Sequence, residues 1–112
     1  MSPTDVVQRQ LDAYNAHDLA AFLATYSETA ELTRIGKAEA PLTGKGAISD
    51  LYASRVFNVQ GHRAELVGRL VFGNKVVDHE RVFGLSSEPF EALAVYEVKE
   101  DLIQRVWFFG AG

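Results

Sequence analysis

Residues 63–83, RAELVGRLVFGNKVVDHERVF, alternate between apolar and polar side chains over much of their length. A period of two residues is typical of a β-strand, because successive side chains point to opposite faces of a sheet. The alternation predicts one face made of Ala64, Leu66, Gly68, Leu70 and Phe72, with Arg63, Glu65 and Arg69 on the other. Gly73-Asn74 has the residue types of a tight turn. The stretch therefore predicts a β-hairpin whose second strand runs from Lys75 to about Leu85.

The C-terminal part of the chain predicts a second hairpin. Its strands are Phe90 to Val98 and Leu102 to Phe109, joined through residues 99–101. Ser86 to Pro89 has turn residues and separates the two hairpins. Gly68 and Gly84 lie inside predicted strands, where glycine permits a bend.

The N-terminal half has the period of helices instead. Ser2-Pro3-Thr4-Asp5 combines a capping serine, a proline and an acidic residue, as helix starts do. Asn15 to Asp18 predicts a break between two helices. The inward faces of the first and second helices are Val7, Leu11 and Tyr14, and then Leu19, Phe22, Leu23 and Tyr26. A strand over Ala30 to Ile35, a loop from Gly36 to Gly46 and a third helix with Ile48, Leu51, Tyr52, Arg55 and Val56 on one face follow.

Helices before strands predict an α+β fold. We expect a cone in which three N-terminal helices pack on a strongly curved, mostly antiparallel sheet. The length of 112 residues fits a single domain, so residues 1–112 are expected to form one domain. Such a cone would enclose a pocket for a small, largely apolar molecule.

Composition excludes several functional classes. A net charge of −4 argues against nucleic-acid binding, which needs a basic face. The chain has no cysteine, so disulfides and thiolate sites are excluded, and a reducing cytoplasm is the expected location. Neither a signal peptide nor an apolar run long enough for a bilayer is present, so no membrane partner is expected. The three histidines lack metal-ligand spacing, and no phosphate loop is found, so no cofactor is expected.

Three short stretches resemble one known family. They are residues 14–32, YNAHDLAAFLATYSETAEL, residues 44–48, GKGAI, and residues 102–108, LIQRVWF. In this order and spacing they resemble the helix–turn–helix–strand opening, the third helix and the closing strand of the SnoaL-like, steroid delta-isomerase-like branch of the nuclear transport factor 2-like superfamily. The resemblance implies the cone-shaped fold over nearly the whole chain. It leaves the function open, because this fold supports many chemistries.

The resemblance also implies that the ketosteroid isomerase machinery is missing. The position of that family's catalytic aspartate falls at Arg34, and its buried protonated aspartate falls at Ala94. The oxyanion-hole tyrosine falls near Gln10, while Tyr26 and Tyr52 match two supporting tyrosines. The pocket would thus be retained without this reaction.

The strand from Lys75 to Phe83 has the most unusual composition for a central strand, since both of its faces are mixed. His79 is the first catalytic candidate, because a histidine inside the cavity exchanges protons near neutral pH. The alternative is a histidine bonded to a neighbour in the core or in an interface. Asp78 and Glu80 share the opposite face, where cross-strand ion pairs with Arg63 and Arg69 are the favoured interpretation and a catalytic carboxylate the other. If the faces are inverted, Asp78 enters the cavity and His79 leaves it.

Tyrosines and the last strand supply the predicted ligand-binding wall. Tyr14, Tyr26 and Tyr52 lie on inward helical faces, and Tyr96 adds a fourth hydroxyl. They either orient a ligand or fill the core. In the last strand we predict Val106 and Phe108 inward and Trp107 outward. An outward aromatic face predicts a homodimer through the outer face of the sheet, as in superfamily members that the chain resembles.

Three functions remain open at this point. The first is cofactor-free acid–base isomerisation, dehydration or cyclisation of a small hydrophobic molecule, with His79, helped by Asp78, moving the proton. The second is non-catalytic ligand binding in the same pocket. The third is an interaction module that works through the sheet face.

Overall fold

The computed structural model describes residues 1–111, which form three helices and six strands. The helices are α1 (Pro3–Asn15), α2 (Leu19–Leu23) and α3 (Lys45–Arg55). The strands are β1 (Tyr26–Arg34), β2 (Leu42–Thr43), β3 (Arg63–Phe72), β4 (Lys75–Phe83), β5 (Phe90–Lys99) and β6 (Leu102–Gly110).

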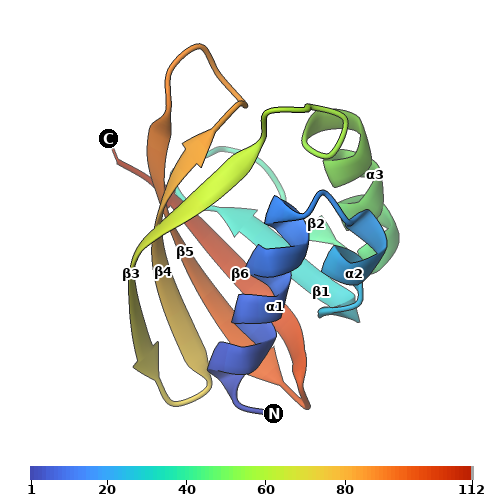
Figure 1. Cartoon of the computed structure of the whole chain (residues 1–112). Coiled ribbons are helices and arrows are strands. Elements are labelled where there is room, and N and C mark those ends of the chain that lie inside the picture. Colours follow the sequence, from blue (N-terminus) through green and yellow to red (C-terminus); the bar gives the residue numbers. More distant parts are fainter. Residues whose placement is uncertain (112) are drawn as a thin grey trace.

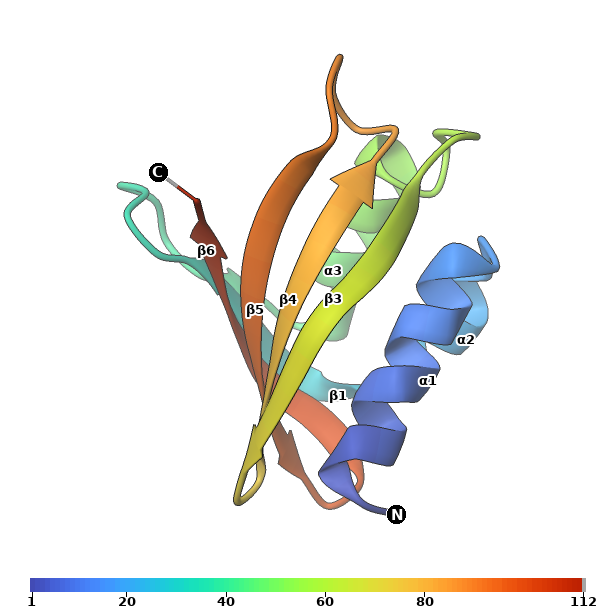
Figure 2. The ribbon, with the colours of Figure 1, turned by 60° about the vertical axis from the view of Figure 1, so that its left-hand side comes forward.

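The strands form one twisted sheet in the order β2-β1-β6-β5-β4-β3 (Figure 1). Every neighbouring pair is antiparallel except β1 and β6, which run parallel. The helices cover one face of the sheet, as Figure 2 shows from the side. The predicted α+β class, with helices packed on a mostly antiparallel sheet, is confirmed. The helices differ in detail, since α2 has only 5 residues and α3 follows the first two strands.

The predicted start of α1 is confirmed by its cap. The Asp5 amide donates to the Ser2 hydroxyl at 3.2 Å, and the Ser2 amide donates to the Asp5 carboxylate at 3.1 Å. This reciprocal capping box satisfies two amides that have no partner inside the helix. The predicted break is present as well, because His17 adopts a φ of 57° and Asp18 caps α2 by accepting from Ala21 at 3.0 Å.

The prediction that Tyr26 belongs to the second helix is wrong. Helix α2 ends at Leu23, and the hydroxyl of Thr25 donates to the Phe22 carbonyl at 2.7 Å. Tyr26 is instead the first residue of β1 and lies opposite Ile103 of β6. Its helical spacing from Phe22 and its inward strand position bury the ring equally well, so the sequence period alone does not separate them.

The predicted faces of β3 are right for its first half and wrong for its second. Leu66 lies opposite Glu80 and Gly68 opposite His79, so Val67 is an extra residue in β3. Such a bulge moves every later side chain to the other face. Ala64 and Leu66 therefore share the interior face with Arg69 and Val71, while Gly68, Leu70 and Phe72 lie on the outer face.

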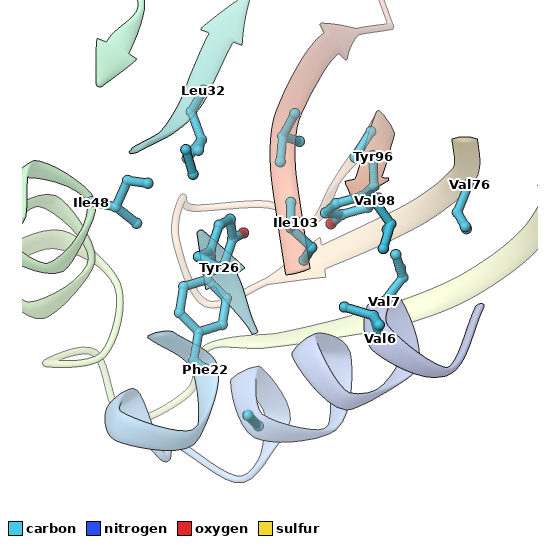
Figure 3. Packing of buried hydrophobic residues seen from close by; sticks show 14 residues of the cluster. Val6, Val7, Phe22, Tyr26, Leu32, Ile48, Val76, Tyr96, Val98 and Ile103 are labelled. Atoms are coloured by element: carbon cyan, nitrogen blue, oxygen red, sulfur yellow. The ribbon is translucent and has the colours of Figure 1, made fainter. Parts of the chain in front are cut away.

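The core lies between the helices and the interior face of the sheet (Figure 3). Val6 and Val7 of α1, Phe22 of α2 and Ile48 of α3 contribute from the helices. The sheet contributes Tyr26, Ala30, Leu32, Val76, Ala94, Tyr96, Val98, Ile103 and Val106. At the free edge, β3 exposes Val67, Leu70, Val71 and Phe72. In the described part of the chain no helix has the length and apolar character to cross a membrane.

Candidate functional site

The interior face of β4 is made of Val76, Asp78, Glu80 and Val82. Val76 and Asp78 are 0% and 1% exposed and lie opposite Tyr96 and Ala94 of the core. His79 lies on the outer face, where its side chain is 43% exposed and contacts Glu91. The expectation that His79 faces the interior is therefore wrong, and the inverted assignment holds. Both faces of this strand are polar, and the packing of Val76 against the helices decides between them.

Asp78 is held by Arg69. Nε and Nη2 of Arg69 donate to the two Asp78 oxygens at 2.7 and 2.9 Å, and Nη1 donates to Gln8 Oε1 of α1 at 2.8 Å. The bond from Asp78 raises the pKa of Arg69. The predicted cross-strand ion pair is confirmed for these two residues. Both Asp78 oxygens are taken up by the guanidinium, and through Arg69 and Gln8 this ion pair ties β4, β3 and α1 together.

Glu80 is the second carboxyl on this interior face. It lies opposite Leu66 of β3 and Ala92 of β5, and is only partly exposed. Within residues 1–111 it has no hydrogen-bond or ion-pair partner. Burial, and then the negative charge of Asp78, raise the pKa of Glu80 to about 7, and Arg69 offsets part of this. Glu80 is therefore partly ionised at neutral pH, as a general acid–base group should be.

Four tyrosines lie close enough to Glu80 for its charge to raise their pKa values. Burial is the larger cause in each case, and it raises the pKa of Tyr14 to about 12. The pKa values of Tyr26, Tyr52 and Tyr96 are also raised. All four hydroxyls therefore keep their protons at neutral pH and can donate to an oxygen atom. Figure 3 shows Tyr26 and Tyr96 on the side of the sheet that faces the helices.

The hydroxyls differ in what they bind. Gln10 Nε2 donates to the Tyr26 hydroxyl at 3.1 Å. Those of Tyr14, Tyr52 and Tyr96 make no hydrogen bond with another described residue. Every fully buried side-chain nitrogen or oxygen of the described residues has a partner. Hence these three hydroxyls, like the Glu80 carboxyl, are not sealed inside the core.

Three of these tyrosines pack against Phe22 in one aromatic cluster. Phe22 lies 5.2 Å from Tyr26, 4.8 Å from Tyr52 and 5.2 Å from Phe57 between ring centroids. Val106 is fully buried in the same core and Phe108 packs against it, while Trp107 lies on the outer face opposite Val95. The orientation predicted for β6 is thus the one observed. The structure brings all four predicted tyrosines, Val106, Phe108 and Asp78 to the interior and leaves His79 outside.

Two surface hollows lie elsewhere. One is lined by Asn74, Lys99 and Gln104 near the β5–β6 turn, and the other by Arg9, Ala13 and Ala21 between α1 and α2. Neither is lined by Glu80 or the tyrosines. No group of three histidine or acidic side chains within residues 1–111 is arranged to hold a metal ion.

The sequence alone did not distinguish Glu80 from Asp78. Both were expected to form cross-strand ion pairs with arginines of the neighbouring strand. The signal that separates them is the strand register. Asp78 lies opposite Arg69, whereas Glu80 lies opposite Leu66 because of the bulge at Val67. Simple alternation along β3, without the bulge, places Arg69 on the face opposite Ala64 and Leu66.

The helices on one face of a curved sheet, with a carboxyl and tyrosines between them, define a small α+β domain of the nuclear transport factor 2-like class. A family model described as SnoaL-like domain matches residues 7–106, so the chain belongs to that family. No curated protein sequence matches the chain.

Solved structures show the same fold. A cystatin fold protein from Novosphingobium aromaticivorans is 24% identical, with a TM-score of 0.85 over 96% of this chain and 97% of that one. A "putative polyketide cyclase" from Sinorhizobium meliloti is 22% identical, with a TM-score of 0.81 over 93% of each chain. A computationally designed 17-OHP binder is 15% identical, with a TM-score of 0.84 over 96% of this chain and 90% of that one.

Proposed function

We propose that the chain binds a small, largely apolar molecule between the helices and the sheet, and that Glu80 moves a proton of the bound molecule. The observation behind this proposal is the Glu80 carboxyl itself, which faces the interior without a partner among the described residues. Its pKa of about 7 means that both protonation states are populated at neutral pH. Such a group accepts a proton from a weak acid and returns it.

The chemistry that fits is proton removal beside a carbonyl group. The Glu80 carboxylate would take a proton from the carbon next to the carbonyl, and a tyrosine hydroxyl would donate to the oxygen as negative charge develops there. Returning the proton to another carbon gives an isomer. Loss of a hydroxyl group, which takes the proton from Glu80 and leaves as water, gives dehydration. Attack of the enolate carbon on a second carbonyl, whose oxygen takes that proton, gives cyclisation. Each outcome uses acid–base groups alone.

The charges of the interior favour an uncharged substrate. The charge of Arg69 is balanced by Asp78, and a third N–H group of Arg69 donates to Gln8. An anionic ligand would therefore meet the Glu80 carboxyl without a free cation to balance its charge. The aromatic rings and hydroxyls suit an apolar molecule with one or two oxygen atoms. A designed protein of this fold is described as a 17-OHP binder, and the Sinorhizobium meliloti protein as a "putative polyketide cyclase". Both descriptions support a small organic molecule as the ligand.

The experiment is a deuterium-exchange assay that needs no knowledge of the product. A panel of apolar ketones is screened by thermal shift, and those that bind are incubated with the protein in deuterated water. We expect exchange at the carbon next to the carbonyl, and a loss of at least about 100-fold in Glu80→Gln, as for removal of a general base.

Glu91→Gln is the matched control, because Glu91 lies on the outer face and is exposed. His79→Ala should also keep full exchange, because His79 shares that face. Equal exchange in Glu80→Gln and wild type would refute the assignment of Glu80.

The second candidate is ligand binding without catalysis. It is favoured by Gln10, Arg34 and Ala94, which stand where the resemblance implies the catalytic residues of ketosteroid isomerase. In the structure Gln10 binds Tyr26, and Arg34 is exposed and paired with Glu39 at 2.6 Å. Ketones that raise the melting temperature but show no exchange in wild type would favour this candidate.

We also propose that two copies associate through the outer face of the sheet. Val77, Val95 and Trp107 form a cross-strand apolar row there. The charges around it balance, since the basic residues are Arg63, Lys75, Arg81 and Arg105 and the acidic ones are Glu31, Glu65, Glu91 and Glu97. A second copy therefore meets no net repulsion on this face. Sedimentation should show a dimer for wild type and a monomer for Trp107→Arg, and a wild-type monomer would refute the interface.

A further inference from the structure

His62 is a buried histidine whose two ring nitrogens both face backbone carbonyl oxygens. It ends the segment that joins α3 to β3 and is 1% exposed. Nδ1 lies 2.9 Å from the Val59 oxygen, and Nε2 lies 2.8 Å from the Tyr14 oxygen. The second oxygen belongs to the last turn of α1.

A carbonyl oxygen only accepts hydrogen bonds, so each of these contacts requires a hydrogen on the ring nitrogen. A neutral imidazole has one N–H and one lone pair. It would place that lone pair against the lone pairs of one of the two oxygens, each of which already accepts a backbone amide, from His17 at 3.2 Å for Tyr14 and from His62 at 3.3 Å for Val59. We propose that His62 is held as the imidazolium cation and is a positioning residue, joining the end of α1 to residues 56–62.

The surroundings favour one positive charge at this place. The carbonyl end of a helix carries partial negative charge, and the last turn of α1 has no basic residue of its own. Within residues 1–111 no carboxylate lies at ion-pair distance from the His62 ring, so the two carbonyl oxygens are the groups that offset the cost of burying the charge. Arg63, the next residue, turns to the outer face, where its guanidinium lies 4.3 Å from the centre of the Phe83 ring.

His17 is the other titratable ring at this cluster besides Tyr14. The two imidazoles stack at 3.7 Å between centroids, with planes 12° apart. Nε2 of His17 lies 2.9 Å from the His62 carbonyl oxygen and donates to it. The neutral form of His17 satisfies this single bond. The stacked pair therefore holds one charge, since two positive rings at this distance would repel each other.

The charge matters for the proposed site because of what His62 touches. The centre of its ring lies 4.7 Å from that of Tyr14 and 5.0 Å from that of Phe57, and both pairs pack edge to face. Tyr14 and Phe57 belong to the aromatic cluster around Phe22. His62 thus fixes Tyr14, which belongs to the predicted ligand-binding wall, and Phe57 beside it. This consequence rests on the proposed function, whereas the charge of His62 does not.

The test is the ¹⁵N spectrum of the histidine rings in the full chain at neutral pH. The chain has three histidines, so His17→Gln and His79→Gln each remove one other set of signals and assign the third. We expect both His62 nitrogens to have the shift of a protonated nitrogen and a one-bond coupling to hydrogen. A neutral tautomer, with one unprotonated nitrogen, would overturn the proposal.

Hydrogen exchange tests the positioning role separately. Glutamine at position 62 can donate to one carbonyl but presents an oxygen to the other. We expect His62→Gln to speed amide exchange in residues 56–62 and at the end of α1 by at least tenfold, with β5 and β6 unchanged. His79→Gln, which changes an exposed side chain on the outer face of the sheet, is the control. Unchanged exchange in residues 56–62 would refute the positioning role, and loss of the deuterium incorporation proposed for Glu80 bears on neither measurement.

Discussion

Replacing Glu80 by glutamine should make the protein more stable in alkaline solution and leave it unchanged in acid. Glutamine has nearly the same shape but cannot ionise. In the folded chain the pKa of Glu80 is raised to about 7, mainly by burial. In the unfolded chain the carboxyl has its ordinary value of 4.5. Below 4.5 both states hold the proton, so wild type and variant should unfold alike.

The difference grows as the pH rises. Between 4.5 and 7 the unfolded wild type ionises while the folded form keeps its proton, so folding becomes progressively less favourable. Above 7 the folded form ionises too and the difference is constant. At about 1.4 kcal/mol for each pH unit between the two pKa values, wild type should lose about 3 kcal/mol relative to Glu80→Gln. With an m-value of about 2 kcal/mol/M, the urea midpoint of the variant should exceed that of wild type by roughly 1 to 2 M.

Urea unfolding followed by far-UV circular dichroism, at a series of pH values from acid to alkaline, measures this directly. Glu91→Gln is again the control, because the carboxyl of Glu91 is exposed on the outer face. Curves for wild type and Glu80→Gln that stay parallel from pH 4 to 8 would mean that Glu80 is solvated like any surface carboxyl. The acid–base role proposed for it would then have no physical basis.

Three further changes test the structure itself by urea unfolding. Arg69→Met should cost about 3 kcal/mol or more because it leaves Asp78 buried without its partner, and adding Asp78→Asn should recover part of that loss. If the losses in unfolding free energy of Arg69→Met and Asp78→Asn simply add in the double variant, the two side chains do not interact as proposed. Ser2→Ala should cost about 1 kcal/mol through loss of the α1 cap, and no loss would mean that the cap frays in solution. Gly84→Ala should cost more than about 2 kcal/mol, because φ is +90° and the new methyl would lie 2.4 Å from the Gly61 oxygen. A neutral Gly84→Ala would show that this close approach is absent.

Most of the order of helices and strands was predictable, because most elements have a clear period and clear ends; the exception is β2, which lies in the stretch from Gly36 to Gly46 predicted as a loop. Ser2 and Asp5 mark the start of α1, and Gly73-Asn74 marks the β3–β4 turn, as found. Such signals are local, so a single sequence contains them. Tyr26 was misplaced because its environment depends on Ile103, far along the chain.

The candidate site was only partly predictable for a related reason. Alternation tells which side chains share a face but not which face is inside. On β4 the two faces have similar polarity, and the choice falls to packing against α1. On β3 the bulge at Val67 reverses the faces midway, so Arg69 meets Asp78 inside the protein. His62 gave no sequence signal, because its partners are backbone carbonyls, which every residue has.

The parallel pairing of β1 and β6 has a consequence for how the chain folds. Strand β1 is made early, yet its long neighbour in the sheet comes more than sixty residues later. Strand β1 has a local partner in the short β2, but its longer pairing is with the distant β6. Contacts so distant in sequence slow folding. Removing residues 102–110 would leave both β1 and β5 without the strand between them, so the pairing of β1 within this sheet depends on β6.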